Sequence, residues 1–131
     1  MADRICLDTT MLVLLLRNDT ATVEWMKNQE SQSLLFTTYV NAFELYCGAY
    51  ASTYKEQNLR AAQELLQRLH VLNLSPESVR HAGDVWATLK TTGQAIEIRD
   101  LLIGTIALVE GCRLKTKNTK HFERIPGLVV D

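Results

Sequence analysis

Four side chains at separated positions could take part in the same chemistry, namely Asp8, Glu44, Asp100 and Asn118. Two of the carboxylates stand in strongly apolar stretches, since Asp100 precedes LLI and Glu44 lies within VNAFELYC. A carboxylate without a partner in such surroundings costs several kcal/mol or takes up a proton. Each should therefore have a partner, which could be an arginine, a helix amino end, a metal ion or water.

Taken one at a time, the three acids also have purely structural explanations. Asp8 could cap the helix that follows it, and Asp100 could be a first-turn acid favoured by the helix dipole or a partner of Arg99. Glu44 could accept a structural hydrogen bond. If the three converge within about 4–6 Å, each pair repels by some kcal/mol at an effective dielectric near 20. Arg99 alone cannot neutralise them, whereas Mg²⁺ or Mn²⁺ accepts carboxylate oxygens and retained waters.

Short apolar runs alternate with helical patterns along the chain. We expect strands over 4–7, 34–37, 70–74, 112–116 and 128–130. We expect helices over 9–19, from Thr20 or Thr22 to 30, from Thr38 to about 52, over 54–69, from Ser75 to Gly93 and over 100–110, and a short turn over 120–124. Strands separated by helices imply right-handed crossovers. The predicted fold class is α/β, a three-layer α/β/α domain over 1–131 with a central, mostly parallel sheet.

This architecture predicts where the four side chains lie. Open parallel sheets bind ligands outside the carboxyl ends of their strands. Asp8 directly follows the first strand, Asn118 follows the fourth, and Asp100 opens a helix that points to the same edge. Glu44 lies in the second turn of the helix after the second strand, so all four are expected at that edge.

Composition excludes several classes of protein. With 47% hydrophobic and 22% charged residues, the chain is typical of an ordinary globular protein. Its longest apolar run, 11–16, is far shorter than the roughly 20 residues of a membrane span, and no secretory signal is recognisable. We therefore expect a cytoplasmic protein without a membrane association. The three cysteines have no C-x-x-C spacing and apolar neighbours, which predicts buried free thiols.

A net charge of −1 gives no global attraction to nucleic acid, so a polyanion would need a local basic patch. One candidate is the segment 113–124, where five basic residues accompany one acid, Glu123. The basic residues are Arg113, Lys115, Lys117, Lys120 and Arg124. This segment could equally be a solvated strand edge and loop.

Four stretches together resemble the motif regions of PIN domains: LDTTMLV, NAFELYCGA, IEIRDLLIGTIAL and LKTKNTKHFERIPGL. The similarity spans nearly the whole chain and is strongest to VapC-type toxins of toxin–antitoxin pairs. It implies a metal-dependent endoribonuclease with Mg²⁺ or Mn²⁺, inhibited by a VapB-like antitoxin and usually a homodimer.

Carried over by the resemblance, the first three acids of the family fall on Asp8, Glu44 and Asp100, and the fourth site falls on Asn118. Asp8 and Asp100 are then metal ligands, Glu44 is a ligand or a base that orients water, and Asn118 is a neutral ligand or a hydrogen-bond partner of bound water. Thr9 is a possible helper through its hydroxyl. Possible contacts to RNA phosphates come from Arg99 and the basic segment, namely from Arg99, Lys115, Lys117 and Lys120.

The chain departs from the family pattern at two places, because Asn118 is neutral and His121 stands where a further aspartate is common. This departure keeps an alternative open: a catalytically degraded PIN-like module that binds RNA or a protein without cutting. A phosphatase of the haloacid dehalogenase type fits less well, because Thr10 stands where its second aspartate is needed. A receiver-like signalling domain fits poorly by spacing, and no Gly-rich nucleotide-binding motif or serine-hydrolase motif occurs.

Overall fold

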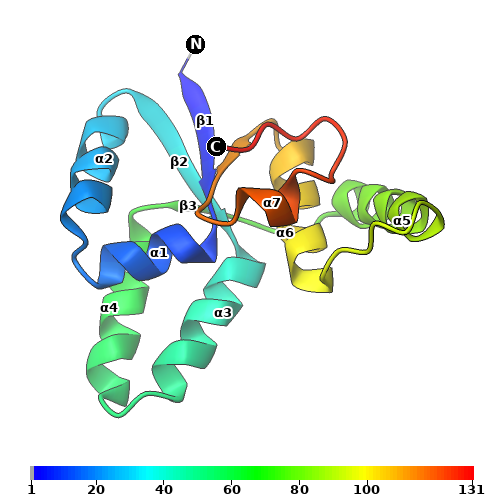
Figure 1. The fold of residues 1–131 in the computed structure, drawn as a ribbon. Helices are drawn as coiled ribbons and strands as arrows, with labels where there is room; N and C mark the ends of the chain where they lie inside the picture. The colour runs from blue at the N-terminus through cyan, green and yellow to red at the C-terminus, as the bar shows by residue number, and fades with distance from the viewer. Residues whose placement is uncertain (1) are drawn as a thin grey trace.

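In the computed structural model, which describes residues 2–131, four parallel strands form a central sheet in the order β3-β2-β1-β4 (Figure 1). The elements in chain order are β1 (Asp3–Leu7), α1 (Thr9–Leu16), α2 (Thr20–Glu30), β2 (Ser33–Thr38), α3 (Tyr39–Tyr50), α4 (Lys55–Gln67), β3 (His70–Leu72), α5 (Pro76–Thr91), α6 (Ile98–Val109), β4 (Arg113–Lys115) and α7 (Thr119–Phe122). The predicted α/β fold class with a parallel sheet is confirmed.

The side chains of β1 point alternately to the two faces of the sheet, and the core is therefore divided into two layers. Ile5 and Leu7 of β1 pack with side chains of α1, α2, α3 and α4 on one face of the sheet, whereas Cys6 packs with α5, α6 and α7 on the other. Side chains of a strand point alternately to opposite faces, so helices can cover both sides. Figure 1 shows the two groups of helices on either side of the strands.

Three expectations about local structure need correction. Residues 128–130 form no strand; Val130 makes a single bridge to Leu114. The helix expected from Asp100 begins at Ile98, because the side chain of Glu97 caps it by accepting from the backbone N–H groups of Arg99 and Asp100.

The third correction concerns the thiols. Cys6 and Cys112 are buried, but Cys47 is exposed. It shares the outer face of α3 with Phe43 and Tyr50, which are also exposed, so apolar neighbours in the sequence did not indicate burial here. Among the described residues, no helix has the combination of length and apolar character that a bilayer crossing requires.

Close packing between α6 and the last part of the chain depends on Gly104. A Cβ atom at this position would lie 2.2 Å from Cδ1 of Ile125 and 3.2 Å from Cδ2 of Leu128. Ile125 is 1% exposed, so its side chain has little room to move. The absent side chain therefore lets α7 and residues 123–128 pack tightly against α6, which brings the region of Asn118 next to that of Asp100.

We predict that Gly104→Ala destabilises the protein by about 1–2 kcal/mol, because the overpacking cost exceeds the gain in helix propensity. Gly83→Ala is the matched control: Gly83 also lies in a helix, but nothing lies within 4 Å of its added Cβ. We expect this control to stabilise by up to about 1 kcal/mol. Urea unfolding of both variants measures the difference, and equal stabilities would contradict the packing argument.

Candidate active site

Asp8 is the most buried of the four candidate side chains, with 4% of its surface exposed at the carboxyl end of β1. Its Oδ2 accepts hydrogen bonds from Oγ1 of Thr116 at 2.8 Å and of Thr10 at 3.3 Å. Its Oδ1 accepts from Nδ2 of Asn41 at 3.2 Å. Asp8 is the N-cap residue of α1, but its side chain makes no capping hydrogen bond. Neutral donors therefore hold this carboxylate, and helix capping does not explain it.

Glu44 lies in the second turn of α3, as expected, and has two partners. Its Oε1 accepts from the Thr9 hydroxyl at 2.7 Å, and its Oε2 lies 3.6 Å from Nη1 of Arg99. Burial raises the pKa of Glu44, and the charges of Asp8 and Asp100 add to this effect, while the Thr9 hydrogen bond and Arg99 oppose it. The structural hydrogen bond expected as one explanation of Glu44 is present and lowers the pKa of this carboxyl, but burial raises it more.

Asp100 lies in the first turn of α6, and its partner is His121 rather than Arg99. Nδ1 of His121 lies 3.2 Å from Oδ2 of Asp100. Burial and then the charge of Asp8 raise the pKa of Asp100, while His121 lowers it. The sequence marked His121 as a departure from the family pattern but did not indicate its contact with Asp100, because this contact depends on the packing of α7 against α6.

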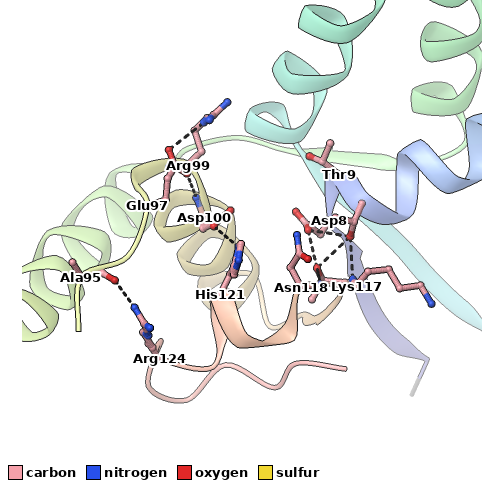
Figure 2. Close-up of polar contacts among 12 residues, drawn as sticks. Asp8, Thr9, Ala95, Glu97, Arg99, Asp100, Lys117, Asn118, His121 and Arg124 are labelled. Atoms are coloured by element: carbon pink, nitrogen blue, oxygen red, sulfur yellow. Dashed lines mark hydrogen bonds and ion pairs between the residues drawn. The ribbon is translucent and has the colours of Figure 1, made fainter. Parts of the chain in front are cut away.

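Glu44, Asp100 and Asn118 line one cavity of about 510 Å³. The rest of its lining consists of Ala95, Ile96, Glu97, Arg99, Lys120, His121 and Arg124. Figure 2 shows Asn118 beside Asp8, and His121 of α7 pointing toward Asp100 of α6. Glu44, Asp100 and Asn118 thus line the same cavity, although they come from α3, α6 and the loop before α7. Asp8 lies next to Asn118 at the edge of this cavity.

The donor set suits a hard divalent cation. Carboxylate oxygens with an amide oxygen beside them are ligands of Mg²⁺ and Mn²⁺. Burial raises the pKa values of Glu44 and Asp100, and the charges of neighbouring acids add to this effect. Within residues 2–131, however, no three Asp, Glu, His or Cys side chains are arranged to hold an ion. In this structure Oε2 of Glu44 faces Arg99 and Oδ2 of Asp100 faces His121.

The basic segment 113–124 does not act as one patch. Arg113 binds two acids, with its Nε 2.8 Å from Oδ2 of Asp3 and its Nη1 paired with Asp131. Nη1 of Arg124 donates to the backbone oxygen of Ala95. These two arginines therefore have structural partners, which corrects the expectation of a continuous basic cluster.

The lysines of this segment divide between two places. Lys120 lines the cavity beside Arg99, which also pairs with Glu97. Nζ of Lys115 lies 5.6 Å above the ring of Trp25, in cation–π contact. Lys117 is exposed and directly precedes Asn118. Of the four side chains expected to contact RNA phosphates, Lys117, Lys120 and Arg99 are thus exposed and close to the candidate site.

Sequence reasoning missed the neutral groups that hold Asp8. Asn41 and Thr116 are 0% and 3% exposed, and both donate to its carboxylate. A signal existed for Asn41, because a polar residue three positions after Thr38 is typical of a helix start and would otherwise be unexpected in a buried apolar stretch. No local pattern pointed to Thr116, which lies 108 residues from Asp8.

Comparisons with known proteins identify the family that this chain resembles along nearly its whole length. The family model for the PIN domain matches residues 5–128. Ribonuclease VapC2 of Haemophilus influenzae is 30% identical over 122 residues, which are 93% of this chain and 92% of the relative. The tRNA(fMet)-specific endonuclease VapC of Shigella flexneri is 30% identical over 125 residues, 95% of this chain and 94% of that protein.

Solved structures of VapBC proteins have the same fold as this chain. VapBC2 from Rickettsia felis, bound to a DNA fragment from its promoter, superposes with a TM-score of 0.91 at 26% identity and covers 98% of this chain and 97% of that one. VapBC from Salmonella typhimurium, also bound to DNA, gives a TM-score of 0.90 at 27% identity and covers 100% and 98%.

We predict that Glu44→Gln raises the melting temperature of the metal-free protein at pH 7 by roughly 1–3 °C. The folded state raises the pKa of Glu44, so the folded protein binds this proton more tightly than the unfolded chain and loses stability as the pH rises through the raised pKa. The gain from Gln should accordingly shrink as the pH falls toward the ordinary value of about 4.3.

Calorimetry in a chelator measures this difference, with Glu64→Gln on the exposed face of α4 as the control. A Glu44→Gln variant that melts below the native protein at pH 7 would show that the contacts to Thr9 and Arg99 outweigh the combined effect of burial and repulsion.

Proposed function

Since this chain belongs to the PIN domain family and has VapC ribonucleases as relatives over more than nine-tenths of its length, we propose that it is a metal-dependent endoribonuclease toxin. It cleaves phosphodiester bonds of RNA and is inhibited by a cognate VapB-like antitoxin. The observation that carries the proposal is the gathering of Glu44, Asp100 and Asn118 around one cavity, with Asp8 beside Asn118.

The donor set at this cavity suits Mg²⁺ or Mn²⁺, with Asp8 and Asp100 as direct ligands. Glu44 is a further ligand or the base that orients water, and Asn118 is a neutral ligand or a hydrogen-bond partner of water. A divalent cation bound there would lower the pKa of a water molecule and stabilise the charge that grows on the phosphoryl oxygens.

The protein's own groups contribute position and proton transfer. Glu44 has a raised pKa, so its carboxylate can accept a proton from the attacking water more readily than an ordinary glutamate. The Thr9 hydroxyl holds Oε1 of Glu44, which leaves Oε2 as the oxygen on the side of Arg99. Nδ1 of His121 holds Oδ2 of Asp100 at 3.2 Å.

Cations at the cavity rim supply contacts to the RNA backbone. Arg99 and Lys120 line the cavity, and Lys117 is exposed next to Asn118. Such contacts to phosphates provide affinity without sequence preference. Lys115 contributes less in this proposal, because its ammonium group already lies over Trp25.

Two further surfaces suit protein partners. A cavity of about 330 Å³ between α1, α3 and α4 has a mainly aliphatic lining that includes Val13, Leu16 and Leu45, and Glu44 forms part of its wall. An antitoxin segment bound there would lie next to the carboxylates, which links inhibition to the candidate site. The exposed aromatic face of α3, with Tyr39, Phe43 and Tyr50, suits the second copy of a homodimer.

The alternative, a PIN-like module that binds RNA without cutting it, is favoured by one observation. Asn118 is neutral, and His121 contacts Asp100 where a further acid is common in the family. Both reduce the negative charge that a second cation would need. The two functions differ in whether the chain cleaves RNA in the presence of Mn²⁺.

We predict that Asp8→Asn lowers RNA cleavage by at least about 10²-fold while RNA binding is retained, because the amide preserves the shape and removes an anionic ligand. Asp84→Asn, on the exposed surface of α5, is the matched control and should cleave normally. Cleavage is followed on total RNA with Mn²⁺ and with a chelator. A native chain that binds RNA as well as Asp8→Asn but cuts none would establish the binding module instead.

We also predict that Lys120→Ala, made in the Asp8→Asn background, weakens RNA binding and lowers the slope of log K against log salt by about 0.7, the value for one phosphate contact to a single strand. Lys55→Ala, at the start of α4 and outside the cavity lining, should leave the slope unchanged. Binding titrations at four salt concentrations measure the slopes. Identical slopes for both variants would show that Lys120 does not contact an RNA phosphate.

A further inference from the structure

One buried amide lies between two of the candidate carboxylates. Asn41 is 0% exposed, in the first turn of α3 and three positions before Glu44. Its Oδ1 accepts from Oγ1 of Thr38 at 2.7 Å and from the Thr38 backbone N–H at 3.2 Å. Because two donors face this oxygen, the orientation of the amide is determined, and Nδ2 points the other way.

Both hydrogens of that nitrogen are used. Nδ2 of Asn41 donates to Oδ1 of Asp8 at 3.2 Å and to Oγ1 of Thr9 at 2.9 Å. Thr9 accepts from Asn41 and so has its own hydroxyl proton free for Oε1 of Glu44, at 2.7 Å. The hydrogen bonds therefore run in one direction, from Asn41 to Asp8 and, through Thr9, to Glu44.

Asn41 and Thr9 hold these two mutually repelling carboxylates with neutral dipoles, whereas Nη1 of the half-exposed Arg99 lies 3.6 Å from Oε2 of Glu44. A lysine or arginine in the place of Asn41 would neutralise the pair and compete with a cation. A neutral amide orients the oxygens and leaves their charge available. Partners behind metal ligands commonly set ligand orientation, and their loss typically costs 10–100-fold in metal affinity or activity.

We propose that Asn41 is the positioning residue that couples Asp8 to Glu44, and that its amide prepares the two carboxylates for a divalent cation. The inference rests on the proposed function, because it assumes that these acids bind metal. It goes further in assigning a role to a side chain that touches neither substrate nor the ion.

The test is Mn²⁺ affinity, measured by titration calorimetry, together with the melting temperature in a chelator. Asn41→Ala should weaken Mn²⁺ binding by about 10–100-fold. Ser78→Ala is the matched structural control, because Ser78 completes the same type of capping box at the start of α5 and is equally buried, at 1% exposure. Both variants should melt at a lower temperature, but Ser78→Ala should bind Mn²⁺ like the native protein.

Variants of Thr9 provide a second test of the inference and leave the N-cap of α3 intact. Thr9→Val has the same shape and removes only the hydroxyl between Asn41 and Glu44, so it should weaken Mn²⁺ binding less than Asn41→Ala. Thr9→Ser restores the hydroxyl and should recover the native affinity. Because the two residues act in one chain of hydrogen bonds, the double variant of Asn41→Ala and Thr9→Val should bind about as weakly as Asn41→Ala alone.

The outcomes separate this inference from the proposed function. If the native chain binds Mn²⁺ and cleaves RNA while Asn41→Ala and Thr9→Val bind Mn²⁺ as tightly as it does, the inference about Asn41 is wrong and the nuclease proposal stands. If the native chain neither binds Mn²⁺ nor cleaves RNA, both are overturned.

Discussion

Mutual repulsion between carboxylates at one edge of a parallel sheet is the constraint on which this structure depends. Asp8 directly follows β1, and Glu44 and Asp100 lie in α3 and α6. Burial raises the pKa values of Glu44 and Asp100, and the charges of the neighbouring acids add to the shift. Ordinary folding would separate such groups or pair each with a cation. Here hydroxyls, an amide and a histidine hold them instead, and Arg99, about half exposed, approaches Glu44 only to 3.6 Å. The molecule thus maintains a local excess of negative charge within a nearly neutral chain.

The architecture makes this excess possible because it brings distant segments to the same place. The parallel register of β1 with β2 and β4 aligns the carboxyl ends of the three strands, so that Asp8, α3 and residues 116–118 follow at one edge. Backbone contact reinforces the alignment, since the N–H of Asp8 donates to the Lys115 oxygen at 2.9 Å. The tight approach over Gly104 then brings α7 against α6. Packing far from the carboxylates therefore determines where His121 and Asn118 lie.

Much of this arrangement was predictable from local signals. Short apolar strands that alternate with amphipathic helices indicated the parallel sheet, and Asp8 directly after a strand indicated its edge. Glu44 was identifiable because a glutamate in so apolar a stretch needs a partner for its carboxylate. The contacts that the prediction missed join residues with no local relation: His121 with Asp100, Thr116 with Asp8, and Arg113 with Asp3 and Asp131. Their partners are chosen by tertiary packing, which periodicity and capping patterns do not encode.

The exposed thiol of Cys47 gives this protein a natural attachment point for a reporter. Burial raises the pKa values of the Cys6 and Cys112 thiols, which keeps both protonated and slow to react. Cys47 is exposed on α3, three residues beyond Glu44 and therefore on the adjoining turn of the helix. A maleimide dye should label this position selectively while the outer face of α3 is free, and protection from the dye would report a second copy bound against that face.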